Sequence, residues 1–199
     1  MVLALRTIGA APHVALAEVG GLVLGKRVLV TGATGGVGRM AVQLAYLAGA
    51  QVTALVRDPA ASAGVLRRLG ATVVTTELIG DFDVIVEGVG GATFGLAIEH
   101  LAPRGVLVNI ATQEDVKTVT FQAQGFDRAH GARIYTLDLP AELTAHASGS
   151  SDLARLGALA ADGRLDAQVE LECSWRQPAE AIDALLRRRI GGKAVLHID

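Results

Sequence analysis

Residues 28–38 read VLVTGATGGVG, an apolar run that passes directly into a turn rich in glycine. Residues 27–31 predict a first strand, and residues 37–48 predict a helix that ends at Gly49. A glycine turn between a strand and a helix is a setting in which a dinucleotide binds, because the free N–H groups at the helix start face its diphosphate. We therefore expect the turn to contact a dinucleotide through Ala33, Thr34, Gly35, Gly36, Val37 and Gly38.

Two of these glycines have separate expected roles. Gly35 would let a diphosphate approach the backbone, and Gly38 would let the helix pack close to the strand. Ala33 stands where the first glycine of such a turn usually lies. A purely structural turn is the alternative interpretation, but the order of strands and helices around it favours nucleotide binding.

Short apolar runs alternate with alanine- and leucine-rich stretches from residue 26 to about residue 134. The runs are apolar almost throughout, as expected of parallel strands that are covered by helices on both faces. The pattern predicts an α/β fold of the Rossmann type, a doubly wound parallel sheet with helices on both faces. The expected further strands are 51–56, 72–75, 83–87, 106–111 and 133–137, and the expected helices are 60–69 and 93–101, the latter closed by a turn at 103–105.

The sequence pattern changes after residue 150. It predicts a helix over 152–161 preceded by its cap Ser151, a strand over 168–173, a helix opened by Pro178, and a last strand over 194–198. Residues 141–151 mix Ser, Gly, Thr and His and are expected to form a loop. We thus expect a lead-in with a short helix over 1–25, a Rossmann core over 26–150, and a helix-strand segment over 151–199 that completes the domain and forms its tail.

The end of the second strand bears on which dinucleotide binds. NAD-binding proteins usually place a carboxylate there to bind the ribose hydroxyls, whereas this chain places Arg57. The forked guanidinium of arginine suits a 2′-phosphate, so the sequence favours NADP(H) over NAD. A strand boundary shifted by one residue would instead bring Asp58 to that point.

In an open parallel sheet the ligand lies across the carboxyl ends of the strands. Residues that follow the fourth and fifth strands are therefore expected to border the nicotinamide: Gly88, Val89, Asn109, Ile110 and Ala111. The peptide groups of Ile110 and Ala111 are candidates for binding the carboxamide. Helix capping is the alternative role for the nearby Gly90 and Gly91, and Asn109 has the alternative of satisfying neighbouring backbone groups.

The composition narrows the remaining classes of function. A hydrophobic fraction of 51% indicates a globular chain, and a net charge of −2 leaves no basic excess for nucleic acid. No apolar run has the roughly 20 residues of a membrane span, so no membrane partner and a cytoplasmic location are expected. One cysteine, Cys173, and five scattered histidines give no metal site. Cys173 is expected to be a half-buried thiol.

No residue is expected to be catalytic. A tyrosine and lysine four residues apart, as in short-chain dehydrogenases, are missing, since Tyr46 is followed by Ala50 and Tyr135 by Leu139. Hydride transfer from a reduced nicotinamide depends on orientation more than on a protein acid, because the cofactor carries the chemistry.

The runs at residues 25–38, 41–45, 82–91 and 191–196 strongly resemble zinc-free medium-chain dehydrogenases/reductases of the quinone oxidoreductase type. The resemblance extends over nearly all of residues 14–199. It implies NADPH-dependent transfer of a hydride to a small molecule, namely a quinone, an enone or a related carbonyl compound. It also implies a homodimer.

Members of that family begin with a GroES-like substrate domain of roughly a hundred residues or more, whereas this glycine turn begins at Ala33. The chain is thus expected to be a partial chain, or a cofactor domain whose substrate face comes from another subunit. A catalytically inactive NADP(H)-binding module is the alternative function. The strand over 194–198 would lack its usual neighbours, and its open edge would favour pairing with another chain.

Overall fold

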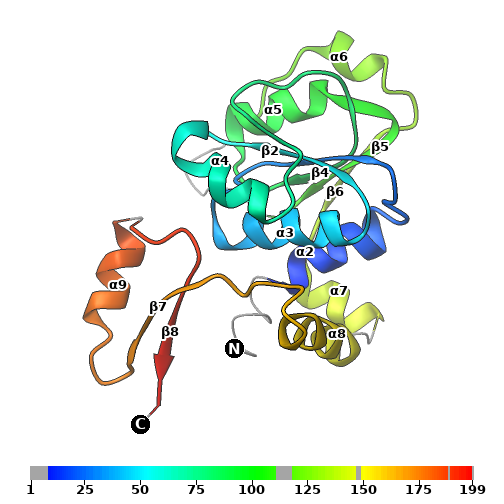
Figure 1. The fold of residues 1–199 in the computed structure, drawn as a ribbon. Coiled ribbons are helices and arrows are strands. Elements are labelled where there is room, and N and C mark those ends of the chain that lie inside the picture. The colour runs from blue at the N-terminus through cyan, green and yellow to red at the C-terminus, as the bar shows by residue number, and fades with distance from the viewer. Residues whose placement is uncertain (1–8, 111–117, 147–148, 188, 199) are drawn as a thin grey trace.

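The computed structural model describes residues 9–110, 118–146, 149–187 and 189–198, and a six-stranded parallel sheet forms its centre (Figure 1). The strand order β3-β2-β1-β4-β5-β6 is that of a Rossmann fold and confirms the predicted class. The order reverses between β1 and β4, where the ligand crevice of such a sheet opens. The strands are β1 (Arg27–Val30), β2 (Gln51–Leu55), β3 (Val73–Thr75), β4 (Phe82–Glu87), β5 (Leu101–Asn109) and β6 (Arg133–Thr136).

The two faces of the sheet bury alternate residues of each strand. Val28 and Val30 pack in one layer with the helices α3 (Gly36–Leu47) and α4 (Pro59–Arg68), and Leu29 packs in the other layer with α5 (Gly91–Glu99). All three of these strand residues have an exposed fraction of 0%. Burial on both faces is the physical reason that the strands are apolar throughout.

The start of the described chain packs against the core. The helical turns α2 (Ala10–Val14) and η1 (Ala15–Val19) bury Val14, Ala15 and Leu16, and so supply the short helix expected in the lead-in. His13 Nε2 lies 3.2 Å from Asp152 Oδ1 on α8 (Gly149–Ala161). This contact joins the beginning of the described chain to a helix that follows the sheet. In the described part of the chain no helix is long and apolar enough to cross a bilayer.

The expected loop over 141–151 is wrong, because helix α7 (Leu139–His146) occupies its first half. Asp138 Oδ1 accepts a hydrogen bond from the Ala141 N–H at 3.2 Å, and Pro140 stands at the start of the helix. These two start signals outweigh the polar composition that follows. Helix α8 begins at Gly149, so Ser151 lies inside it and is not its cap. A short helix, α6 (Ala123–Asp127), also precedes β6.

The expected turn at 103–105 is part of strand β5. Helix α5 ends at Glu99, and β5 begins at Leu101, which pairs with Phe82 of β4. The pairing then shifts by several residues before it resumes at Val106, and Arg104 within the shift has a φ of 59°. The turn residues therefore form an irregularity inside the strand instead of ending a helix.

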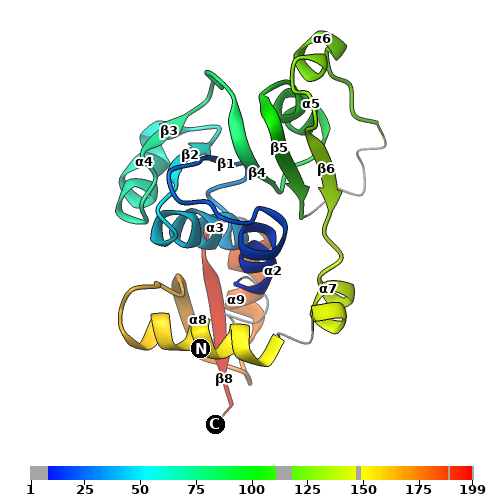
Figure 2. The same ribbon diagram turned by 90° about the vertical axis from the view of Figure 1, so that its right-hand side faces the viewer.

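The end of the chain forms a second, two-stranded parallel sheet from β7 (Val169–Ser174) and β8 (Lys193–His197). Helix α9 (Ala179–Leu186), whose N-cap is Pro178, connects the two strands. Figures 1 and 2 show this unit beside the main sheet, reached through the segment after α8. Strand β8 has β7 as its neighbour, and in the described residues its other edge pairs with no strand.

Candidate dinucleotide-binding site

The glycine turn leaves β1 at Thr31 and enters α3 at Gly36. Gly32, with a φ of 59°, reverses the chain, and its carbonyl accepts a hydrogen bond from the Gly35 N–H at 3.0 Å. Gly35 is the N-cap of α3; no side chain caps this helix and its first turn holds no acidic residue. The first-turn N–H groups and the positive end of the helix dipole therefore face outward without a carboxylate of the helix itself.

Gly38 and Gly35 differ in what surrounds them. A Cβ at Gly38 would lie 2.2 Å from the Gly32 carbonyl oxygen and 2.7 Å from Ala33 Cα, so the close contact of helix and turn requires glycine there. At Gly35 the nearest atom to a Cβ would be 3.5 Å away, and the φ of −79° suits any residue. Packing within the protein explains why residue 38 is a glycine but not why residue 35 is one. Gly35 is exposed, as is Thr34.

A buried polar pair lies where β1 and β4 end. The Thr31 hydroxyl donates to Glu87 Oε1 at 3.0 Å, and the Gly88 N–H donates to the Thr31 hydroxyl oxygen at 2.9 Å. The Glu87 carboxylate, 0% exposed, also accepts from the N–H groups of Val89 and Gly90 at 2.9 and 3.0 Å. Sequence reasoning missed this pair, for which the available signal was a carboxylate directly after the apolar run 84–86.

These bonds determine which groups of the loop after β4 are available to a ligand. The N–H groups of Gly88, Val89 and Gly90 are all used within the protein. Gly90 is the N-cap of α5, as the capping alternative expected, and Gly91 is the first residue of that helix. Contacts from Gly88 and Val89 to a nicotinamide would have to come from their carbonyl groups and carbon atoms.

Backbone groups at the end of β5 are likewise hydrogen-bonded within the protein. The Ile110 N–H donates to the Glu87 carbonyl at 2.9 Å, so this N–H is not available to a carboxamide. The Asn109 carbonyl accepts from the Leu137 N–H at 2.9 Å. Ala111 lies outside the described residues. The structure thus brings Asn109 and Ile110 to the same edge as Glu87, in line with the parallel register of β4 and β5.

Arg57 and Asp58, the two alternatives at the end of β2, differ in their surroundings. Asp58 is the N-cap of α4, and its Oδ1 accepts from the Ala61 N–H at 3.1 Å. Its carboxylate is thereby engaged at the helix start, where a negative charge is favourable. Arg57 is exposed beside it, between β2 and α4.

In the described ranges of the chain, no three His, Cys, Asp or Glu side chains are grouped so as to hold a metal ion. Cys173 is half-buried with a free thiol.

Known proteins similar to this chain include reductases and a polyketide synthase. Prostaglandin reductase-3 from Bos taurus is 38% identical over 130 residues, which cover 59% of this chain and 34% of the relative. A phenolphthiocerol/phthiocerol polyketide synthase protein of Mycobacterium tuberculosis (strain ATCC 25618 / H37Rv) is 26% identical over 92% of this chain and 9% of that protein. The chain thus spans about a third or less of the curated relatives it matches.

Solved structures match almost the whole chain. The crystal structure of 2-haloacrylate reductase has a TM-score of 0.83 and 22% identity, over 98% of this chain and 65% of that one. The crystal structure of AibC has a TM-score of 0.79 and 26% identity, over 100% of this chain and 60% of that one. A family model described as zinc-binding dehydrogenase matches residues 65–196. With the Rossmann sheet and the glycine turn, this match shows that the chain belongs to the zinc-binding dehydrogenase family.

Proposed function

We propose that this chain binds NADP(H) on the turn 33–38 and is the cofactor domain of a zinc-independent reductase. The acceptor of the hydride would be a small quinone, enone or related carbonyl compound. The observation that carries the proposal is the uncapped start of α3 at Gly35, beside the point where the sheet order reverses. The matched proteins support it, since they include a prostaglandin reductase and a 2-haloacrylate reductase. A quinone oxidoreductase from Coxiella burnetii and a mycobacterial protein complexed with NADPH share the fold.

The residues of the site fit the parts of NADP(H). The N–H groups of Gly36, Val37 and Gly38 would bind the diphosphate, and Arg57 the 2′-phosphate. NADPH supplies the hydride when bound, so the chain's own task is to bind and orient the cofactor. Gly88, Val89, Asn109, Ile110 and Ala111 would border the nicotinamide. We assign no catalytic side chain.

The cofactor assignment is tested by substituting Gly35, a turn glycine that packing does not require. Gly35→Ala should keep the melting temperature of the wild type, because its methyl group meets only ordinary contacts. The methyl would stand where the diphosphate approaches, so the Kd for NADPH should rise about tenfold or more. Gly157→Ala on α8, where nothing lies within 4 Å of a Cβ, is the control and should leave the Kd unchanged. Equal NADPH binding by wild type and Gly35→Ala would contradict the assignment, as would no binding by the wild type.

The alternative to a reductase is NADP(H) binding without catalysis. NADPH oxidation, followed at 340 nm against a panel of quinones and enones, separates the two. Turnover supports the reductase, and binding without turnover supports the binding module. The homodimer, the cytoplasmic location and the domain borders at residues 25 and 150 stay predictions, of which sedimentation would check the first.

A further inference from the structure

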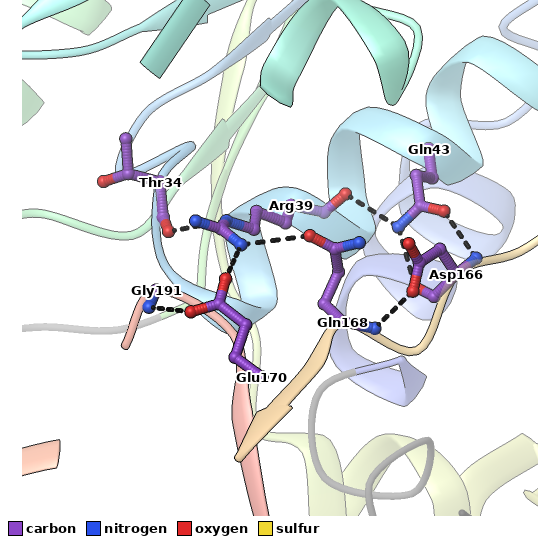
Figure 3. Close-up of polar contacts among 7 residues, drawn as sticks. All are labelled: Thr34, Arg39, Gln43, Asp166, Gln168, Glu170 and Gly191. Atoms are coloured by element: carbon purple, nitrogen blue, oxygen red, sulfur yellow. Dashed lines mark hydrogen bonds and ion pairs between the residues drawn. The ribbon is translucent and has the colours of Figure 1, made fainter. Parts of the chain in front are cut away.

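Arg39, the residue after Gly38, connects the glycine turn to the C-terminal sheet (Figure 3). Its Nε donates to the Thr34 carbonyl at 3.1 Å, and its Nη1 donates to Gln168 Oε1 at 3.0 Å. The same guanidinium forms an ion pair with Glu170. Thr34 belongs to the turn, whereas Gln168 directly precedes β7 and Glu170 lies at its start. One side chain, 14% exposed, therefore holds two segments that are about 130 residues apart in sequence.

The C-terminal side of this contact is itself tightly connected. Glu170 Oε2 accepts from the Gly191 N–H at 2.9 Å, and the Lys193 N–H donates to the Gln168 carbonyl at 2.7 Å. A Cβ at Gly191 would lie 2.2 Å from Arg39 Nη2, so the guanidinium is packed directly against this backbone. Arg39 thereby contacts β7 through Glu170 and the segment before β8 through Gly191.

A separate contact fixes the same segment without reaching the turn. Gln43, one helical turn after Arg39, donates to the Asp166 carbonyl at 3.0 Å and accepts from the Asp166 N–H at 2.7 Å. Asp166 Oδ1 in turn accepts from the Gln168 N–H at 2.8 Å. The segment thus stays attached to α3 when Arg39 is removed, which separates its role at the turn from the attachment itself.

The charge of Arg39 is already paired. Burial tends to raise the pKa of Glu170, but the hydrogen bond from Gly191 and the contact with Arg39 outweigh it and hold the pKa below its ordinary value. Glu170 is therefore ionised at neutral pH and neutralises the guanidinium. Any influence of Arg39 on an anion at the turn acts through the geometry of Thr34 more than through net charge.

We propose that Arg39 is a positioning residue that couples the glycine turn to the sheet of β7 and β8. It holds the Thr34 carbonyl in place, and through Gln168 and Glu170 it holds the sheet against the turn. NADPH binding and the seating of β7 and β8 then strengthen each other, since coupling between two sites is reciprocal. The inference rests on the proposed function, because it takes NADPH as the ligand of the turn.

A double-mutant cycle tests this coupling with the Kd for NADPH as its readout. Arg39→Ala and Glu170→Ala should each raise the Kd about five- to tenfold, and the double variant should raise it no further than the larger single effect. Glu170 does not touch the turn, but it also binds Gly191, where an added Cβ would lie 3.1 Å from the Thr34 carbonyl oxygen. An effect of Glu170 that passes through Arg39 is non-additive in the cycle, whereas one that passes through Gly191 adds to that of Arg39→Ala. Arg68 is exposed at the end of α4 and lines one pocket together with Arg39 and Glu170. Arg68→Ala removes an equal charge and should leave the Kd within about twofold.

Hydrogen exchange gives a readout that a loss of stability alone would not produce. NADPH should slow amide exchange in β7 and β8 of the wild type, and Arg39→Ala should abolish this protection while the exchange in β1 and β4 stays slow. If Arg39→Ala does not fold, Glu170→Ala carries the test, because the Glu170 side chain is 34% exposed.

The outcomes distinguish the two proposals. NADPH binding by the wild type with an unchanged Kd in Arg39→Ala, or additive effects in the cycle, would overturn the coupling and leave the proposed function intact. A wild type that does not bind NADPH would overturn the proposed function and the coupling with it.

Discussion

The hydroxyl of Thr31 donates a 3.0 Å hydrogen bond to Glu87, and this bond joins the ends of β1 and β4. The two side chains are 1% and 0% exposed. The partners described for the carboxylate are one hydroxyl group and the N–H groups of its own loop. The shape of both loops that flank the crevice therefore depends on one buried pair.

Thr31→Val tests that dependence, because valine keeps the shape of threonine and removes its hydroxyl. The Gly88 N–H and the Glu87 carboxylate each lose a buried partner, so the free energy of unfolding should fall by about 1–3 kcal/mol. Urea denaturation measures the change. The matched control is Thr72→Val at an exposed position, which should stay within about 0.5 kcal/mol of the wild type. Similar losses in both variants would show that the hydroxyl of Thr31 has no special role.

Gly38→Ala should destabilise the protein, because its Cβ would meet backbone atoms of Gly32 and Ala33 that have no free space to move into. The expected loss is about 1–3 kcal/mol or more, as for other overpacked sites. Gly157→Ala places the same methyl group in open space inside helix α8 and should stabilise the protein by about 0.5–1 kcal/mol. Thermal unfolding compares the two. Shifts of the same sign would contradict the packing role of Gly38.

Arg57→Asp should weaken NADPH binding more than NADH binding. The guanidinium is expected to bind the 2′-phosphate that only NADPH carries, so the Kd for NADPH should rise about tenfold or more. Arg67→Asp, also exposed but in the last turn of α4, makes the same change of charge away from the strand end. Isothermal titration with both cofactors gives the ratio. Equal losses of affinity for NADPH and NADH would show that Arg57 does not bind the 2′-phosphate.

Glu170 should make the protein sensitive to acid. Its pKa is lowered in the folded state, so its stabilisation is complete above the ordinary glutamate pKa of about 4.3 and is lost as the pH falls through the lowered pKa. The difference in unfolding free energy between wild type and Glu170→Gln should therefore shrink between pH 6 and pH 3. Glu77→Gln, an exposed residue outside this network, should show a difference near zero at both values. A constant difference for Glu170→Gln would contradict the ion pair with Arg39.

The core of the fold was predictable from sequence because each parallel strand carries its own signal. Val28, Leu29 and Val30 are buried on alternate faces, so the run is apolar whichever face is considered. The glycine turn was predictable for the same reason, because its whole signal lies within one short stretch of sequence. Helix α7 was missed because Asp138 and Pro140 had less weight in the prediction than the polar residues after them.

Contacts between distant segments left no comparable signal. Arg39 is a single charged residue in an amphipathic helix, a pattern typical of a solvated position. Its partner Glu170 is 131 residues away in an alternating strand. The pairing of Thr31 with Glu87 likewise depends on β1 and β4 being neighbours, which the order of elements along the chain alone does not state.

Gln168 stands at the point where the chain turns from the main body into β7, with a φ of 54° and an exposed fraction of 9%. An L-residue in this left-handed conformation costs roughly 1–2 kcal/mol, a cost that glycine would not carry. Its amide group binds Arg39 and its carbonyl binds Lys193, so exchange for glycine would relieve the backbone but release one of the two bonds. The hydrogen bond between the Gln168 side chain and Arg39 thus holds the start of the small sheet in a backbone conformation that glutamine otherwise disfavours.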